Sequence, residues 1–160
     1  MSLLVFSLIL TFHTYVSAFP GGAPTESCDS LSPQRGHKAN PQPARNAPYD
    51  IIQSAVYYNP GDVINVAIRR LDPQASFKGF MVQALDKETG KYIGKFIEAP
   101  GLAVMKECSA VSHSNPKPKI AVHLAWVAPN DHSGQVVFRA TIVETRKVFY
   151  EGLQSQLDRN

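Results

Sequence analysis

The fold class is decided by the stretch His123–Val143, which reads HLAWVAPNDHSGQVVFRATIV. Apolar residues alternate with other residues over positions 120–126 and again over 136–143. A period of two places one apolar set on a single face of a pleated strand. The intervening residues 129–134 include the proline, asparagine, aspartate, serine and glycine that turns favour. The stretch therefore predicts two strands joined by a turn, in the manner of a hairpin.

Trp126, the single tryptophan of the chain, closes the first of these strands. A large aromatic side chain contributes most when its area is buried, so we expect Trp126 to anchor a core between two sheets. The alternative is a ring that stacks on a ligand.

Most of the chain after residue 48 shows the same alternation, interrupted by turn residues such as those of Asn59–Asp62. Further strands are expected at 49–56, 63–70, 77–85, 92–97, 102–107 and 146–150. The polar segment 109–119 predicts a surface loop, residues 152–160 predict a tail, and no helix is expected. About seven to nine short strands with turns between them are typical of an all-β, Greek-key β-sandwich.

Residues 19–48 are rich in proline and poor in large apolar residues. Proline fixes φ and has no backbone N–H, so this segment is predicted to be an extended arm. A chain of 160 residues predicts one domain. We expect it to comprise the arm at 19–48, the sandwich at 49–151 and the tail at 152–160.

Residues 1–18 have the features of a signal peptide. Residues 3–12 form an apolar run of the expected length, and Val16, Ser17 and Ala18 occupy the cleavage positions. The run is shorter than the roughly 20 apolar residues of a transmembrane helix. We therefore predict a secreted, soluble protein that begins near Phe19 and has no membrane span.

Secretion determines how the two cysteines, Cys28 and Cys108, are interpreted. In an oxidising compartment one intramolecular disulfide is the simplest outcome, and two free or intermolecular thiols are the alternative. Such a bond would pin the arm to the sandwich with Cα atoms about 4.4–6.8 Å apart. Chain entropy alone makes a loop of this length worth roughly 4–5 kcal/mol.

Residue patterns that carry catalysis are missing from the sequence. The histidines after residue 18 are His37, His113, His123 and His132, and none has metal-ligand spacing to another. The consecutive residues Asp131, His132 and Ser133 cannot form a catalytic relay within one turn, so we interpret them as turn residues. We predict no catalytic residue, no metal site, no cofactor and no enzymatic activity.

The charge of the chain is mildly basic, with 16 Lys+Arg against 13 Asp+Glu and a net charge of +3. This is too little for a nucleic-acid partner, which requires a clustered basic face. Weak candidates for binding an anionic envelope polymer, such as lipopolysaccharide or teichoic acid, are Arg69, Arg70, Lys117, Lys119, Arg146 and Lys147. The alternative is that these residues are ordinary solvated surface, and the oligomeric state stays open.

Several motifs, in order along the chain, resemble the reeler (reelin N-terminal) domain. They are Cys28 with Pro33 and Gly36-His37, Tyr49, Asn59-Pro60-Gly61, Phe77–Ala84, Cys108, Trp126–Pro129 and Gly134–Thr141. The chain is most similar to the small secreted insect defence proteins of that family.

This resemblance implies an immunoglobulin-like sandwich, residence in haemolymph and a role in innate immunity. The expected function is antimicrobial defence by binding microbial surfaces or by promoting haemocyte aggregation. An extracellular adhesive or matrix-binding module without an immune role is the alternative. The matching residues are structural, so the resemblance implies no ligand-binding residue.

Overall fold

The computed structural model describes residues 21–159, so the predicted signal peptide lies outside the described residues. Its strands are β1 (Tyr49–Gln53), β2 (Tyr57–Tyr58), β3 (Val63–Arg70), β4 (Gly79–Asp86), β5 (Lys95–Phe96), β6 (Leu102–Met105), β7 (Ala110–His113), β8 (Ala121–Val127), β9 (Gly134–Val143) and β10 (Phe149–Leu157). Short helical turns are η1 (Thr25–Ser27), α1 (Gln34–His37), η2 (Ala44–Asn46) and η3 (Lys106–Cys108). None of the helices in the described part of the chain has the length and apolar character needed to cross a membrane.

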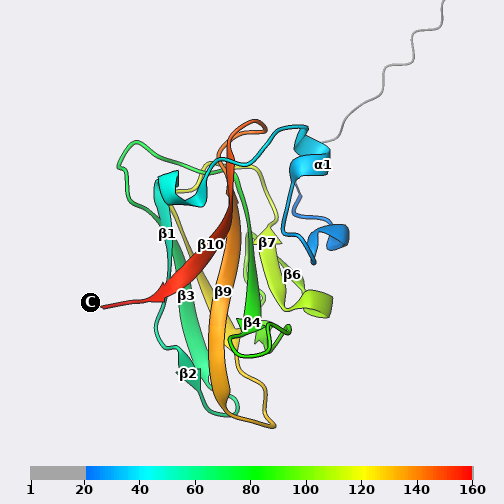
Figure 1. Ribbon diagram of the computed structural model, residues 1–160, viewed down its shortest axis with the longest axis vertical. Helices are drawn as coiled ribbons and strands as arrows, with labels where there is room; N and C mark the ends of the chain where they lie inside the picture. Colours follow the sequence, from blue (N-terminus) through cyan, green and yellow to red (C-terminus); the bar gives the residue numbers. More distant parts are fainter. Residues whose placement is uncertain (1–20, 160) are drawn as a thin grey trace, which may run out of the picture.

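The strands form two layers that share β10, as Figure 1 shows. One layer has the order β5-β8-β3-β1 and the other has the order β9-β4-β7-β6, with β2 paired to the start of β9. The first part of β10 pairs antiparallel with β9, and its last residues, 155–157, pair in parallel with β1. A bulge between Tyr150 and Leu153, where Gly152 has a φ of +74°, lets β10 pass from one layer to the other. The predicted all-β sandwich is confirmed, and its two sheets are joined into one nearly closed sheet.

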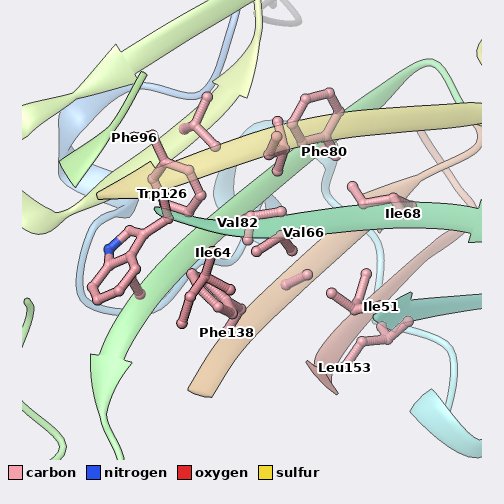
Figure 2. Packing of buried hydrophobic residues seen from close by; sticks show 14 of the residues in the cluster. Ile51, Ile64, Val66, Ile68, Phe80, Val82, Phe96, Trp126, Phe138 and Leu153 are labelled. Atoms are coloured by element: carbon pink, nitrogen blue, oxygen red, sulfur yellow. The ribbon is translucent and has the colours of Figure 1, made fainter. Parts of the chain in front are cut away.

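The core lies between the layers and is shown in Figure 2. Trp126 is 0% exposed, and its ring packs edge-on against Tyr58 and Phe138 with centroids 5.4 and 5.8 Å apart. Its Nε1 donates a hydrogen bond to the Ile93 carbonyl at 3.0 Å, so burial leaves no unpaired donor. Gly94 touches the indole so closely that a Cβ there would lie 2.3 Å from the ring. The prediction that Trp126 anchors the core is confirmed.

The predicted hairpin around this tryptophan is wrong. Strand β8 pairs with β3 and β5, whereas β9 pairs with β4, β10 and β2. The turn at 128–133 therefore carries the chain from one layer to the other. Turn residues are the same in a hairpin and in a connection between sheets, so the sequence pattern did not separate the two.

Three other expectations are corrected. Strand β7 lies inside the predicted loop 109–119, where Ser112 is fully buried and donates from Oγ to the Phe80 carbonyl at 3.0 Å. The predicted strand 92–97 is reduced to β5, which pairs with β8, and only a single bridge between Tyr92 and Leu85 joins the start of this segment to β4. The predicted tail at 152–160 is strand β10 as far as Leu157.

The N-terminal arm, residues 21–48, passes beside β7 and over the top of the sandwich (Figure 1). It contains η1, η2 and the four-residue helix α1, although no helix was predicted. Its first part is held where the Ala23 amide donates to Ser112 Oγ at 2.8 Å, and its later part where the Gln42 amide donates to the Phe149 carbonyl at 2.8 Å. The arm is therefore attached to β7 and to β10, the strands on either side of β4 and β9.

Candidate functional site

The predicted basic candidates all lie at one end of the sandwich, which we call the basic end. Arg69 and Arg70 close β3, Lys117 and Lys119 precede β8, and Arg146 and Lys147 lie between β9 and β10. Antiparallel register explains why these positions meet, because Arg69 faces Ala121 and Gly79 faces Val143. The ends of β3 and β9 and the beginnings of β4, β8 and β10 therefore share one end of the fold.

Main-chain hydrogen bonds hold the loops of the basic end together. Phe77 and Lys119 exchange two bonds of 3.0 and 2.8 Å between their amides and carbonyls. The Arg70 amide donates to the Ile120 carbonyl at 3.3 Å, and the Lys78 amide donates to the Val143 carbonyl at 2.8 Å. Residues that are far apart in sequence thus lie on adjoining loops with a defined arrangement.

Two of the candidates, Arg69 and Lys119, use their charged groups in contacts within the protein. Arg69 forms an ion pair with Asp50, with Nε 2.9 Å from Oδ1 and Nη2 3.0 Å from Oδ2. Lys119 Nζ donates to the carbonyls of Lys78, Asn115 and Lys117 at 3.0, 2.9 and 2.8 Å. Burial lowers the pKa of Lys119. Arg69 and Lys119 therefore organise the loops and are poor candidates for ligand contact.

The other candidates keep an available positive charge. Lys117, Arg146 and Lys147 are exposed, and the Arg70 guanidinium contacts the neutral carbonyl of Pro73. In the described part of the chain, the one ion pair at this end is that of Arg69. The basic end is thus a positively charged surface made by several loops.

One further cation of this surface, Lys78, was missed by sequence reasoning. It was assigned to a strand at 77–85, but β4 begins at Gly79 and Lys78 is exposed in the preceding loop. The lysine itself was a usable signal in the sequence, because an unpaired lysine side chain is almost never fully buried.

The histidines form no cluster with metal-ligand character within residues 21–159. His132 lies at the opposite end of the sandwich, where Nδ1 is 2.7 Å from Asp131 Oδ1 and Nε2 is 3.1 Å from the Tyr58 hydroxyl. Ser133 Oγ is directed to Asn59 Oδ1 at 3.4 Å. These residues stabilise a turn, which is the role that their adjacency in sequence predicted.

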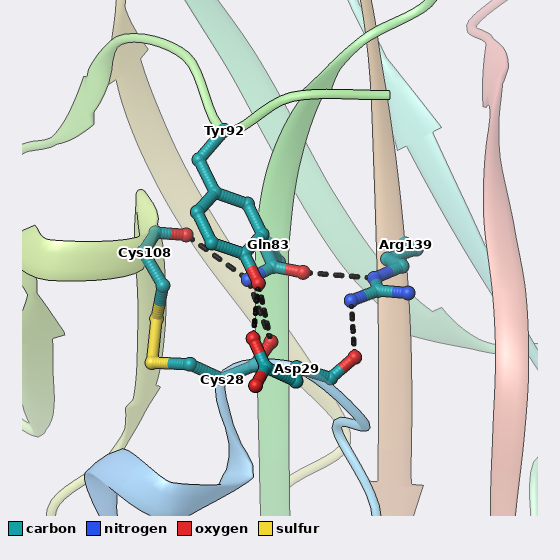
Figure 3. Close-up of a disulfide and its surroundings, with 6 residues drawn as sticks. All are labelled: Cys28, Asp29, Gln83, Tyr92, Cys108 and Arg139. Carbon is teal, nitrogen blue, oxygen red and sulfur yellow. Dashed lines mark hydrogen bonds between the residues drawn. A yellow bond between two sulfur atoms is a disulfide. The ribbon is translucent and has the colours of Figure 1, made fainter. Parts of the chain in front are cut away.

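The arm is fastened beside a buried polar network, shown in Figure 3. Cys28 and Cys108 form a disulfide with Cα atoms 5.8 Å apart, as the cysteine count led us to expect. The fully buried Gln83 donates from Nε2 to the Cys28 and Cys108 carbonyls and accepts from Arg139 Nε at 2.8 Å. Arg139 Nη2 in turn donates to the Asp29 carbonyl at 2.9 Å. A buried glutamine with all these partners fixes the arm in one position on β4 and β9.

Comparison with known proteins agrees with this architecture. Residues 26–157 match the model of the Reeler domain family. "Putative defense protein 3" of Antheraea mylitta is 36% identical over 143 residues, which cover 87% of this chain and 85% of the relative. Ferric-chelate reductase 1 of Bos taurus is 32% identical over 155 residues, and the chain spans a quarter of its length, 25%.

A solved structure shows the same fold. The crystal structure of the Reelin-N domain of F-spondin superimposes with a TM-score of 0.61 and 24% identity, over 81% of this chain and 98% of that chain. The family match extends over nearly all of the described residues and includes both cysteines and all ten strands. The chain belongs to the Reeler domain family.

Proposed function

We propose that this protein is a secreted defence protein of haemolymph that binds anionic polymers on microbial surfaces through the basic end. The observation that carries the proposal is the convergence of Arg70, Lys78, Lys117, Arg146 and Lys147 on one end of the sandwich. Similarity to the defense protein of Antheraea mylitta, over most of both chains, supports the immune role.

The physical argument concerns many weak contacts on a repetitive ligand. An exposed ion pair is worth only about 0–1 kcal/mol, so no single lysine can hold a polymer. A repeating phosphate or carboxylate polymer meets several cations at once, and contacts made together strengthen one another. Such binding weakens as salt rises, because exposed charges are screened beyond roughly 10 Å at 0.1 M salt.

The test is a binding assay of the mature protein on lipopolysaccharide, lipoteichoic acid, peptidoglycan and β-glucan at two salt concentrations. The variant Lys117→Glu/Lys147→Glu reverses two exposed charges and leaves the Arg69 and Lys119 contacts unchanged. We expect its affinity for the anionic polymers to fall about tenfold at low salt, because the loss of roughly 0.7 kcal/mol of binding free energy at each of the two positions corresponds to that factor.

Lys87→Glu/Lys91→Glu is the matched control, since both lysines are exposed in the β4–β5 connection and the change in net charge is identical. An equal loss in this control would contradict the proposal, because it would reflect net charge alone. Binding to host matrix with no binding to any microbial polymer would favour the adhesive module instead.

A further inference from the structure

A cavity of about 740 Å³ lies between the arm and the outer face of the β4–β9 sheet, next to the basic end. Its lining is mainly apolar. Arm residues Leu31 and Pro33 form one wall, and Met81 and Val143, on the outer face of the sheet, form the other. This volume falls in the range of about 300–1,000 Å³ that is typical of small-molecule sites.

The local sequence explains why the arm does not collapse onto the sheet here. Gly79 faces Val143 across the sheet and places no side chain on the floor of the cavity. A Cβ at Gly79 would lie 2.8 Å from the ring of His113, so glycine is required at this position. The arm is held on both sides of the cavity, by Ser112 and the disulfide before it and by Phe149 after it. The space is therefore part of the fixed architecture.

Two polar atoms in the cavity wall have no hydrogen-bond partner among the described residues. They are the hydroxyl of Thr141, a residue only 3% exposed, and Nδ1 of His37. A buried polar atom normally has a partner, and each exception requires an explanation. Valine has the same shape as threonine, so packing alone does not call for a hydroxyl at position 141. A ligand that brings its own polar atom into the cavity would give both atoms a partner.

Two cations lie at the rim of the cavity. Lys78 and the exposed Arg146 line it, and Arg146 Nη2 donates to the Gly36 carbonyl of α1 at 3.2 Å. Burial, and then the charge of Arg146, lower the pKa of His37, which keeps the imidazole neutral at neutral pH and able to exchange hydrogen bonds. The lining also includes three acidic residues, Glu26, Asp29 and Glu144. Glu144 accepts a hydrogen bond from the Tyr49 hydroxyl at 3.0 Å, and Asp29 accepts one from the Tyr92 hydroxyl at 2.9 Å.

We propose that this cavity binds one unbranched fatty-acyl chain. The chain lies against Leu31, Met81 and Val143, and its oxygen-bearing end contacts the Thr141 hydroxyl and His37, near Arg146. The chain can come from a free fatty acid or from a lipid of the microbial envelope, and both offer the same chemistry. This inference goes beyond the proposed function, because it does not depend on polymer binding at the basic end.

The first test uses sodium tetradecanoate and isothermal titration calorimetry on the folded, disulfide-bonded protein. Val143→Phe fills the cavity and should abolish binding. Val137→Phe is the matched control, since Val137 lies on the same strand and the same outer face, is partly exposed in the same way, and does not line the cavity. Trp126, at the opposite end of the sandwich, reports by its fluorescence that each variant is folded.

Thr141→Val provides a second variant that keeps the shape of the wall. It should fold and bind tetradecanoate about fivefold more weakly, which is the loss of one hydrogen bond. Absence of tetradecanoate binding to the wild type would overturn the inference. Equal binding by Val143→Phe and Val137→Phe, or undiminished binding by Thr141→Val, would overturn it as well.

The source of the chain is decided by comparing intact lipopolysaccharide with lipopolysaccharide from which the acyl chains have been hydrolysed. If Val143→Phe no longer binds intact lipopolysaccharide but binds deacylated lipopolysaccharide as the wild type does, the result would support an envelope lipid. Loss of tetradecanoate binding alone would support a free fatty acid. The Lys117→Glu/Lys147→Glu variant should still bind tetradecanoate, so a failure of the proposed function and a failure of this inference give different results.

Discussion

The two faces of strand β9 differ in how completely they are packed. On the inner face, Phe138, Ala140 and Ile142 are at most 1% exposed, and all three contribute apolar groups to the core. On the outer face, under the arm, Arg139 is held by Gln83 and the Asp29 carbonyl, and Thr141 lies beside a cavity. One strand therefore serves a close-packed core on one side and a polar, incompletely filled layer on the other.

This difference indicates which part of the molecule is selected for stability and which part is available for function. A close-packed core gains free energy from every buried methylene, so cavities there are costly. The outer layer carries a buried hydroxyl without a protein partner, which costs stability and gives the fold nothing in return. The arm and the sheet face below it are thus the region where we expect ligand-dependent behaviour.

The largest effect should follow from releasing the arm. Replacing both Cys28 and Cys108 by alanine should lower the free energy of unfolding by about 4–5 kcal/mol if chain entropy dominates. The arm should open before the core, with early tryptic cleavage near Arg35, Lys38 and Arg45. Limited proteolysis followed by mass spectrometry shows when each cut appears. If the fluorescence of Trp126, which reports on the core, changed before these cuts appeared, the predicted order of unfolding would be wrong.

The substitution Trp126→Ala tests how much the close-packed core contributes to stability. Loss of a fully buried tryptophan should cost about 3–5 kcal/mol, because the remaining side chains cannot fill the space. Urea denaturation monitored by circular dichroism measures the loss. A folded, equally stable variant that had lost ligand binding would instead assign the tryptophan to recognition.

A smaller effect of opposite sign is expected on the outer face. Thr141→Val should raise the free energy of unfolding by about 1 kcal/mol, because it removes a buried hydroxyl that has no protein partner. Thermal unfolding of the unliganded protein checks the sign. A lower melting temperature in the valine variant would mean that the hydroxyl supports the fold.

The smallest effect is a pH dependence confined to the arm. The folded-state pKa of His37 lies below its ordinary 6.5, first through burial and then through the charge of Arg146. A group with a lowered pKa stabilises the folded state above its unfolded pKa, and this contribution is lost as pH falls through the folded value. The hydrogen-exchange protection factors of residues 34–42, which correct for the slower intrinsic exchange at lower pH, should therefore decrease as the pH drops below 6.5. His37→Phe should flatten this response, whereas His123→Phe, at an exposed position of β8, should leave it intact.

Local alternation was enough to predict the strands whose two faces differ. Strand β3 was predicted with its observed bounds, because the large buried residues Ile64, Val66 and Ile68 alternate with the smaller or polar residues Asn65, Ala67 and Arg69. Strand β7 was missed because Ser112 and His113 are polar residues. In the structure, however, Ser112 is fully buried and its hydroxyl donates a hydrogen bond to the Phe80 carbonyl. Its polar partner lies on β4, and nothing in the local sequence indicates that contact.

The site was less predictable than the fold. The sequence identified six cations, but only the register of β3, β4, β8 and β9 places them at one end. Ion pairing of Arg69 and the carbonyl contacts of Lys119 could not be foreseen, because they depend on the paths of loops. The cavity depends on the arm and the sheet together, and on Gly79, which the sequence placed within a predicted strand without indicating the space beside it.

The position of β10 has a consequence for how the protein is made. This last strand of the described chain lies between β1 and β9, and Ile51 is paired with Ser155, about a hundred residues later. Until β10 leaves the ribosome, β1 and β9 each present an open edge, and such edges favour pairing with other chains. Long-range pairings of this kind also form slowly. Closure of the sheet is therefore a late step of biosynthesis, and a chain that stalls before residue 149 would expose two adhesive strand edges to its neighbours.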